Sequence, residues 1–444
     1  MARATRKNPR QTLTDVAAAY APLSVQGIVA AGGGGDPTMK MTAVIMGDSI
    51  VNQAHSEYNS GTIRTANSNG WWTHLNCRLG HRFKLLRNSG IPGETTTQQA
   101  ARFQADVVAL APGWVFLGGP TNDTSLTQAE TVANLVSMWN AADAAGIRIV
   151  QLTVTPKTGA TTVVKDRANE INNYLRRTAR ERKGLVLIDW NSKLSVGSSM
   201  DWKLGHTNVS DTSGLHPNPQ GAAAMGQIAA ERVALMTPAI DVCPQNNGDA
   251  SNLIVNPLQF GTAGTIGAGG SGQLSDSWRV DPLSTTVFTC RKVARTDGIP
   301  GFWQEITLVS GELKIGQNIT GFGTVYNTAD QLYALAEFQT DTDIPANTTS
   351  RVRLNLIAMK PDFGVGAQGI DMEQTAGIVF PEAQYFPRQG VFQTPLVVVP
   401  STATLRMAFQ FEVRGSGTFR IGRSGMYKAA NGPGADVWAG VIPA

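Results

Sequence analysis

The chain has 444 residues, 42% of them hydrophobic and 16% charged, which is typical of a globular protein long enough for two domains. The formal net charge is +4, but Arg3, Arg6, Lys7 and Arg10 lie within the first ten residues, and the other basic residues balance the 33 acidic ones. Because the folded part is then neutral and no apolar run is long enough to cross a bilayer, we expect neither a nucleic-acid nor a membrane partner.

Residues 1–39 are predicted to form an N-terminal arm that serves for attachment. The apolar stretch at residues 13–20 is interrupted by Asp15 and followed by Pro22, so it lacks the compact core of a signal peptide. Four glycines at residues 32–35 indicate a flexible linker between the arm and the first domain. We therefore predict an arm without a signal peptide.

The three cysteines, Cys77, Cys243 and Cys290, are widely spaced, and an odd number cannot be fully paired within one chain. No histidine lies near a pair of cysteines, as a zinc site would require. The sequence thus predicts neither a disulfide framework nor a metal, and we expect no cofactor.

Residues 40–238 alternate between predicted strands and helices. Short apolar runs predict strands, and longer stretches with apolar residues three to four apart predict helices. The strands are expected at residues 42–46, 114–117, 148–154 and 185–189, and the helices at residues 127–145, 164–179 and 219–235. Such alternation favours an α/β domain whose parallel sheet is covered on both faces.

Residues 239–444 have a different pattern. Apolar residues alternate with polar ones at residues 405–414 and 352–356, residues 332–338 form another strand-like run, and Gly, Pro, Asn and Asp separate these segments. Since no long helical pattern intervenes, we predict an all-β antiparallel sandwich.

Four loop segments of the first domain carry residues suited to nucleophilic catalysis. Gly47-Asp48-Ser49 directly follows the first strand, where open α/β sheets bind ligands. His216, just before the last helix, supplies a base for a serine hydroxyl. The backbone N–H groups of Ser49 and Gly93 and the side-chain amide of Asn122 are candidate donors to an oxyanion, and this chemistry needs no metal.

The four blocks, which carry Ser49, Gly93, Asn122 and His216 in this order along the chain, resemble the SGNH/GDSL hydrolases, a family of esterases, lipases, thioesterases and carbohydrate deacetylases. The resemblance implies a flavodoxin-like α/β/α sandwich over residues 40–238. It also implies that Ser49 is the nucleophile, that Gly93 and Asn122 complete the oxyanion hole with Ser49, and that His216 is the general base.

One position departs from the family pattern. The family has an Asp three residues before the His, and this chain has Ser213 there. Asp211 lies two residues earlier, and we predict it to be the third catalytic residue. A backbone carbonyl or Asp201 could instead orient the imidazole, or the site could be inactive. Pro120 also lengthens the block that carries Asn122 and could displace its side chain.

The second domain resembles carbohydrate-binding jelly-roll sandwiches in its opening run at residues 252–257 and its closing strand at residues 418–422. This resemblance implies sugar binding for residues 239–444, and trimerisation is the alternative role for this domain. Aromatic side chains that could stack on sugar rings are Trp278, Trp303, Tyr326, Tyr333 and Tyr385, although core packing is the alternative for most of them.

The order of arm, glycine linker, esterase and β-rich end resembles bacteriophage tail fibre or tailspike proteins. It implies a homotrimer in the virion that docks to the tail or baseplate through its arm and acts at the host surface. We expect an esterase that removes acetyl groups from a host surface polysaccharide. The alternatives are a receptor-binding fibre with a degraded site and a secreted esterase for small lipids.

Overall fold

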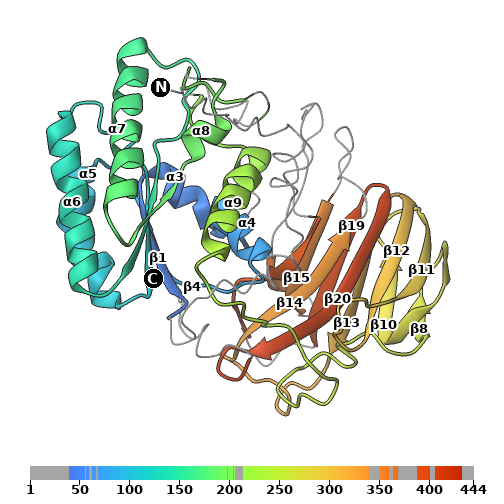
Figure 1. The fold of residues 1–444 in the computed structure, drawn as a ribbon. Coiled ribbons are helices and arrows are strands. Elements are labelled where there is room, and N and C mark those ends of the chain that lie inside the picture. Colours follow the sequence, from blue (N-terminus) through green and yellow to red (C-terminus); the bar gives the residue numbers. More distant parts are fainter. Residues whose placement is uncertain are drawn as a thin grey trace, which may run out of the picture.

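A computed structural model describes the greater part of the chain as two regions that lie side by side, one α/β and one rich in β-strands (Figure 1). The described residues are 40–55, 57–59, 63–66, 69–197, 199–203, 205, 214–340, 351–359, 364–368, 388–400 and 406–432.

The first region is built on a five-stranded parallel sheet with the strand order β4-β1-β5-β6-β7. Its strands are β1 (Thr42–Gly47), β4 (Lys84–Gly90), β5 (Trp114–Leu117), β6 (Arg148–Leu152) and β7 (Leu185–Ile188). This is the doubly wound order of flavodoxin-like folds, whose ligands bind where the order reverses, beside the first strand. The predicted α/β fold is confirmed, and β4 is added to the four predicted strands.

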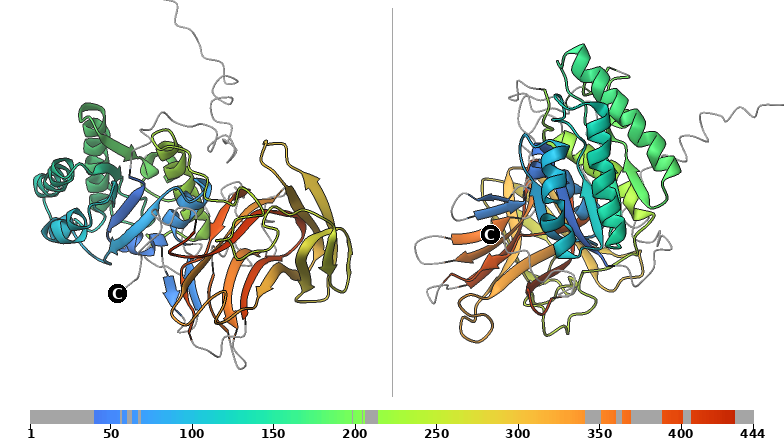
Figure 2. Two further views of the ribbon diagram at one scale, coloured as in Figure 1. Left: turned by 90° about the horizontal axis from the view of Figure 1, so that it is seen from below. Right: turned by 90° about the vertical axis from the view of Figure 1, so that its left-hand side faces the viewer.

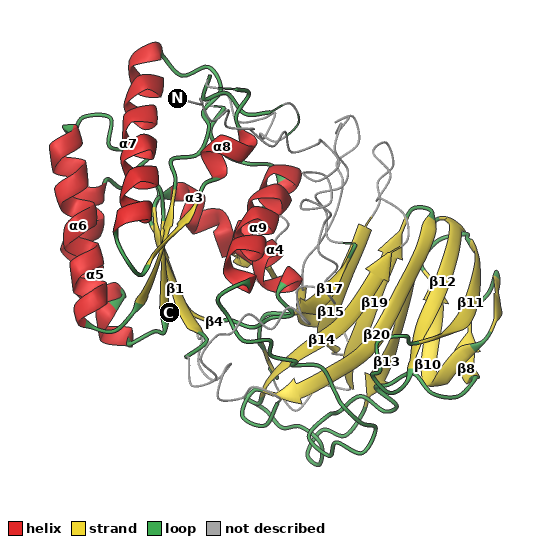
Figure 3. Cartoon of the chain, in the orientation of Figure 1, coloured by secondary structure: helices red, strands yellow, loops and turns green. Residues whose placement is uncertain are grey.

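Helices cover both faces of this sheet (Figure 3). Ala43 and Ile45 of β1 pack with one group of helices, whereas Val44 and Met46 pack with the other, because successive strand residues point to opposite faces. The first group comprises α3 (Ser49–Asn52), α4 (Trp71–Arg78), α8 (Trp190–Leu194) and α9 (Pro219–Ala234); the second comprises α5 (Thr96–Asp106), α6 (Gln128–Ala144) and α7 (Thr162–Glu181).

Local signals set where the predicted helices begin. Thr127 accepts a hydrogen bond from the backbone N–H of Glu130, whose side chain bonds back to Thr127, so a complete capping box precedes α6. Asn218 caps α9 and is followed by Pro219 at the first helical position. Both helices begin within a residue of their predicted starts.

The second region consists of two sheets of mostly antiparallel strands, as predicted for an all-β region. The eight-stranded sheet has the order β2-β3-β16-β15-β19-β13-β10-β8, and the seven-stranded sheet has the order β17-β14-β20-β12-β11-β9, with β18 (Val397–Val398) paired to β14. The strands of the first sheet are β2 (Glu57–Asn59), β3 (Ile63–Ala66), β8 (Ala263–Ile266), β10 (Leu274–Pro282), β13 (Glu312–Ile319), β15 (Arg351–Met359), β16 (Gly364–Gln368) and β19 (Arg406–Arg414). Those of the second are β9 (Gly270–Gly272), β11 (Val287–Ala294), β12 (Phe302–Ser310), β14 (Gln331–Thr340), β17 (Gln389–Gln393) and β20 (Gly417–Lys428).

The two sheets share one buried core. Met407, Phe409, Phe411 and Val413 of β19 are buried, as their alternation predicts, and they belong to the same cluster as residues of β14, β12 and β20 in the other sheet. Trp278 and Phe409 meet edge to face with their ring centroids 5.7 Å apart. Trp278 and Tyr326 are buried in this core, and Tyr333 is buried beside Tyr427, whereas Tyr385 lies outside the described residues.

Strand pairing and side-chain packing also connect the two regions, in addition to the chain that links them. β2 and β3, which lie between β1 and α4 in the sequence, pair with the eight-stranded sheet through parallel contacts between β3 and β16 (Figure 2). Cys77 of α4 and Ala223 of α9 belong to the core cluster of the β-rich region. Of the helices that the structure describes, none is both long and apolar enough to span a membrane.

Candidate active site

Ser49 lies at the carboxyl end of β1 and is the first residue of the short helix α3. The side chain of Asp48 caps this helix by accepting a hydrogen bond of 2.9 Å from the backbone N–H of Ile50. A Cβ at Gly47 would lie 3.1 Å from the Cα of Gly118, at the end of β5, and 2.6 Å from Cγ2 of Val51. Glycine at this position therefore lets the loops after β1 and β5 meet beside Ser49.

His216 is placed against the serine across 167 residues of sequence: its Nε2 lies 2.9 Å from Oγ of Ser49. The loop before it is fastened by a hydrogen bond of 3.0 Å from the N–H of Thr158 to the carbonyl of Gly214. Gly214 has φ of +59°, and a Cβ there would lie 2.4 Å from the carbonyl oxygen of Thr158, so only glycine fits. Asn218, which caps α9, fixes the other side of the loop.

Gly93 and Asn122 are brought together on the remaining loops of this edge. The loop after β4 is tied to the serine loop by a hydrogen bond of 3.0 Å from the N–H of Ile91 to the carbonyl of Gly47. The Asn122 side chain donates one hydrogen bond, of 3.2 Å, from Nδ2 to the carbonyl of Glu94, the residue after Gly93. Although Pro120 lengthens the block, the Asn122 amide still contacts the loop that carries Gly93.

Two buried carboxylates that the sequence analysis did not single out support these loops. Asp123 accepts hydrogen bonds from the N–H and hydroxyl of Thr96 at 2.8 and 2.6 Å and from the hydroxyl of Thr131 at 2.7 Å. Glu94 pairs with Arg102 of α5, whose Nε lies 2.9 Å from Oε1. A signal for Asp123 was its place directly after Asn122, whereas nothing in the sequence pairs Glu94 with Arg102.

The predicted third catalytic residue, Asp211, lies outside the described residues, as does Ser213. Asp201, the alternative carboxylate, is engaged elsewhere, because its two oxygens accept hydrogen bonds of 2.8 and 3.0 Å from Nζ of Lys165. Asp211 therefore remains a prediction.

Asp48 is a second titratable group beside the nucleophile. Its side chain is buried, and burial raises the pKa of this carboxyl from 3.8 to about 6, although the hydrogen bond from Ile50, contact with Thr121 and the charge of His216 all act to lower it. A carboxyl with this pKa changes its charge mostly between about pH 5 and pH 7.

The arrangement is suited to acyl transfer. A histidine nitrogen within hydrogen-bond reach of a serine hydroxyl can take its proton as the hydroxyl attacks a carbonyl. The first N–H groups of a helix have no partner within it, so the N–H of Ser49 is a natural donor to the oxyanion. Among the described residues, no group of three His, Cys, Asp or Glu side chains is placed to hold a metal ion.

Residues 45–224 match the model of the GDSL-like Lipase/Acylhydrolase family, so the chain contains a GDSL-like acylhydrolase domain. No curated protein matches the chain.

Solved structures of GDSL-like proteins are similar to less than half of the chain. A protein described as lipolytic and of the G-D-S-L family, from Desulfitobacterium hafniense, is 21% identical over 43% of this chain and 98% of its own, with a TM-score of 0.35. A GDSL-like lipase from Bacteroides thetaiotaomicron is 19% identical over 44% and 87%, with a TM-score of 0.34. A lipase/acylhydrolase from Enterococcus faecalis is 21% identical over 44% and 95%, with a TM-score of 0.32.

Proposed function

We propose that the chain is a serine esterase in which Ser49 is the nucleophile and His216 the general base. The observation that carries this proposal is the distance of 2.9 Å between Nε2 of His216 and Oγ of Ser49 at the switch point of the sheet. Oγ attacks the ester carbonyl while His216 takes its proton. His216 then protonates the departing alcohol, and a water molecule hydrolyses the acyl-serine by the same steps.

Oxyanion stabilisation is proposed for the N–H groups of Ser49 and Gly93 and the amide of Asn122. The Asn122 amide carries two hydrogens. One is directed to the carbonyl of Glu94, which orients the amide and leaves the second for the oxyanion. A fixed donor of this kind is typically worth about 3 kcal/mol of barrier.

Asp211 is proposed to hold the second nitrogen of His216. In serine proteases, replacing the corresponding carboxylate by its amide lowers turnover by about 10⁴-fold, because the imidazole takes the wrong tautomer. An Asp211→Asn variant is expected to lose activity on this scale, and Asp201→Asn is the matched control because Asp201 pairs with Lys165. Equal activity of the two variants would reject Asp211 as the third residue.

The proposed substrate is an acetyl ester on a host surface polysaccharide, and the proposed setting is a phage tail fibre or spike. Its support is the order of arm, glycine linker, hydrolase and β-rich region, together with strands of the hydrolase segment that complete a sheet of that region. The arm is proposed to bind tail or baseplate components, and the chain is proposed to form a homotrimer in the virion. Mass photometry of the full chain tests the trimer, and a monomer would reject it.

Hydrolysis of p-nitrophenyl acetate by the full chain, beside Ser49→Ala, tests the esterase. We expect product from the native chain and background release from the variant. Equal release from both would favour the alternative of a receptor-binding fibre with a degraded site, for which Ser213 in place of the family's Asp is the specific observation.

Substrate class is tested separately, with acetate release from an O-acetylated bacterial polysaccharide and with p-nitrophenyl esters of increasing acyl length. We expect acetate release and a preference for acetyl over octanoyl esters. Preference for octanoyl esters with no acetate release would support a small-ester lipase instead.

A further inference from the structure

A cavity of about 350 Å³ lies between the two regions, away from Ser49. Gly80 of the first region contributes to its wall, as do Ile240 and Asp241 in the segment after α9, and the rest comes from the seven-stranded sheet and its loops. Gly80 follows the carboxyl end of α4, whereas the amino end of α4 touches the serine helix through Nε1 of Trp71 and the carbonyl of Ile50. A helix of this length spans about 12 Å, so the cavity and the serine lie at opposite ends of α4.

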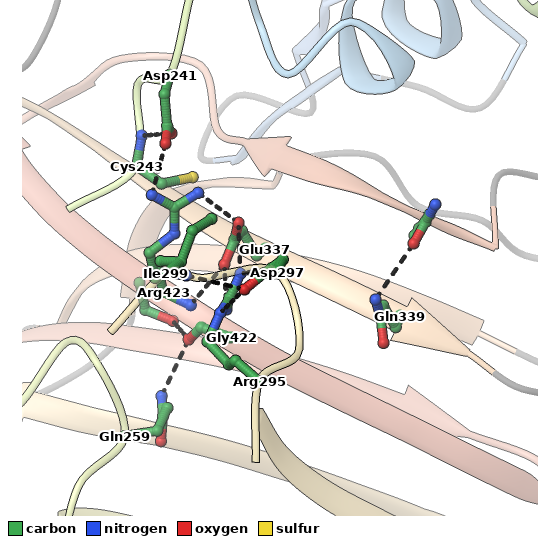
Figure 4. A network of polar contacts seen from close by, with 12 residues as sticks. Asp241, Cys243, Gln259, Arg295, Asp297, Ile299, Glu337, Gln339, Gly422 and Arg423 are labelled. Atoms are coloured by element: carbon green, nitrogen blue, oxygen red, sulfur yellow. Dashed lines mark hydrogen bonds and ion pairs between the residues drawn. The ribbon is translucent and has the colours of Figure 1, made fainter. Parts of the chain in front are cut away.

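The cavity borders a network of ion pairs in which every side chain except that of Asp241 is largely buried (Figure 4). The guanidinium of Arg423 joins Oδ2 of Asp241, at 2.7 Å, to Oε1 of Glu337, at 2.6 Å. The guanidinium of Arg295 joins the same Glu337, at 2.8 Å, to Oδ2 of Asp297, at 2.7 Å. Three carboxylates thus share two guanidinium groups, and every side chain of the network is fixed by at least one charged partner.

This charge balance selects against ions as ligands. Both guanidinium groups are already held by two carboxylates each, and these five side chains together carry one more negative than positive charge. A phosphate or carboxylate ligand would therefore meet an excess of like charge, and a cation would compete with two arginines already in place. A neutral ligand meets neither obstacle.

The rest of the wall suits a ligand with both apolar and hydroxyl surface. Apolar side chains line much of the cavity, among them Trp303, Ile299 and Val391, and Arg295 lies over the Trp303 ring at 4.4 Å from its centroid, which fixes the ring. Gln339 donates from Nε2 to Oε1 of Gln389 at 3.2 Å, and this bond orients both amides. It leaves the Gln339 carbonyl oxygen and an N–H of Gln389 for a ligand hydroxyl.

We propose that this cavity is a non-catalytic binding site for a neutral sugar unit, with the apolar face of the ring against Ile299 and Trp303 and its hydroxyls on Gln339 and Gln389. The volume lies within the roughly 300–1,000 Å³ of small-molecule sites, which favour the junctions between domains. The site does not depend on the proposed esterase activity.

Saturation-transfer NMR on the full chain tests the site, with the methyl α-glycosides of glucose, galactose and mannose as probes and sodium glucuronate as the charged comparison. At least one neutral glycoside is expected to receive saturation, and glucuronate is expected to receive less. The signal should persist in Ser49→Ala, because the cavity lies apart from the serine.

Two variants locate the ligand. Ile299→Trp enlarges a half-buried loop side chain in the wall and is expected to lower the signal by about tenfold. Val309→Trp, at an exposed position of β12, is the matched control and should leave it unchanged. The pair Gln339→Ala and Gln389→Ala, combined in one chain, should also lower the signal, because it removes the amides proposed to bind the sugar hydroxyls. Melting curves establish that each variant is folded.

The proposal is overturned if no neutral glycoside receives saturation, if glucuronate gives the stronger signal, or if the folded wall variants keep the full signal. Loss of the signal in Ser49→Ala would place the sugar at the serine and would also overturn it. Loss of esterase activity alone leaves this site unaffected, so the two proposals fail by different measurements.

Discussion

Two buried carboxylates, Asp48 beside the nucleophile and Glu337 at the junction of the two regions, are held in opposite ways. Asp48 accepts a hydrogen bond from the uncharged backbone N–H of Ile50, and burial raises the pKa of its carboxyl to about 6. Glu337 accepts hydrogen bonds from two guanidinium groups. The comparison indicates that the junction is held by paired charges, whereas the serine loop keeps a carboxyl whose ionisation the fold resists.

The largest effect is expected for a substitution in the catalytic site. His216→Ala removes the base for Ser49 and should lower kcat for p-nitrophenyl acetate by about 10⁴-fold or more. The melting temperature should change little, because the His216 loop is also fixed through Gly214 and Asn218. Residual activity near the native level, in a folded variant, would remove His216 from the mechanism.

At the junction, Glu337→Gln should lower the unfolding free energy of the protein and leave its esterase activity unchanged. The amide keeps the shape of the carboxylate but leaves each of the two buried guanidinium groups with one aspartate, and it weakens two hydrogen bonds between charged groups, each typically worth about 1.5–3 kcal/mol. Urea denaturation measures this loss. Glu181→Gln, at an exposed position at the end of α7, is the control and should stay within about 0.5 kcal/mol. Equal unfolding free energies for the two variants would contradict a structural role of the network.

Asn122→Ala tests the oxyanion hole and should lower kcat by about 10²–10³-fold with a smaller change in KM. The effect appears in kcat because the amide acts on charge that develops only during the reaction. Asn140→Ala, an exposed asparagine on α6, serves as the control for the same substitution away from the site. A loss confined to KM would assign Asn122 to substrate binding instead.

The smallest effect is expected for Asp48→Asn, which keeps an acceptor for the N–H of Ile50 but removes the charge. Because the folded-state pKa of about 6 lies above 3.8, the folded protein binds the proton more tightly than the unfolded chain does. The unfolding free energy should therefore fall as pH rises from about 4 to 6, by about 3 kcal/mol at most. Thermal melts at several pH values should show this fall in the native chain and a flatter profile in Asp48→Asn. A native profile as flat as that of the variant would contradict the raised pKa.

The sequence predicted four of the five parallel strands, since their residues are largely apolar and largely buried. It missed β4, because this edge strand carries Arg87, Asn88 and Ser89 and does not form such a run. The pairing of β3 with β16 was also beyond prediction, as it joins segments about three hundred residues apart that carry no mutual signal.

The polar residues divide in the same way into those that the sequence could predict and those that it could not. Ser49 and His216 could be singled out because their loops stand in the order typical of GDSL-like hydrolases, and the structure places the two side chains together. The junction network could not be singled out in this way, because Asp241 and Arg423 are 182 residues apart and meet only in the folded chain. Long-range pairs of charged residues have no local pattern from which a partner can be chosen.

The central claim is that Ser49 is an activated nucleophile, and covalent labelling tests it most directly. The full chain is incubated with a fluorophosphonate ester, and the labelled peptide is identified by mass spectrometry. We predict that the label is carried by the peptide with Ser49, that Ser49→Ala abolishes it, and that His216→Ala slows it strongly. A folded native chain that remains unlabelled, or a label that persists in Ser49→Ala, would contradict the claim.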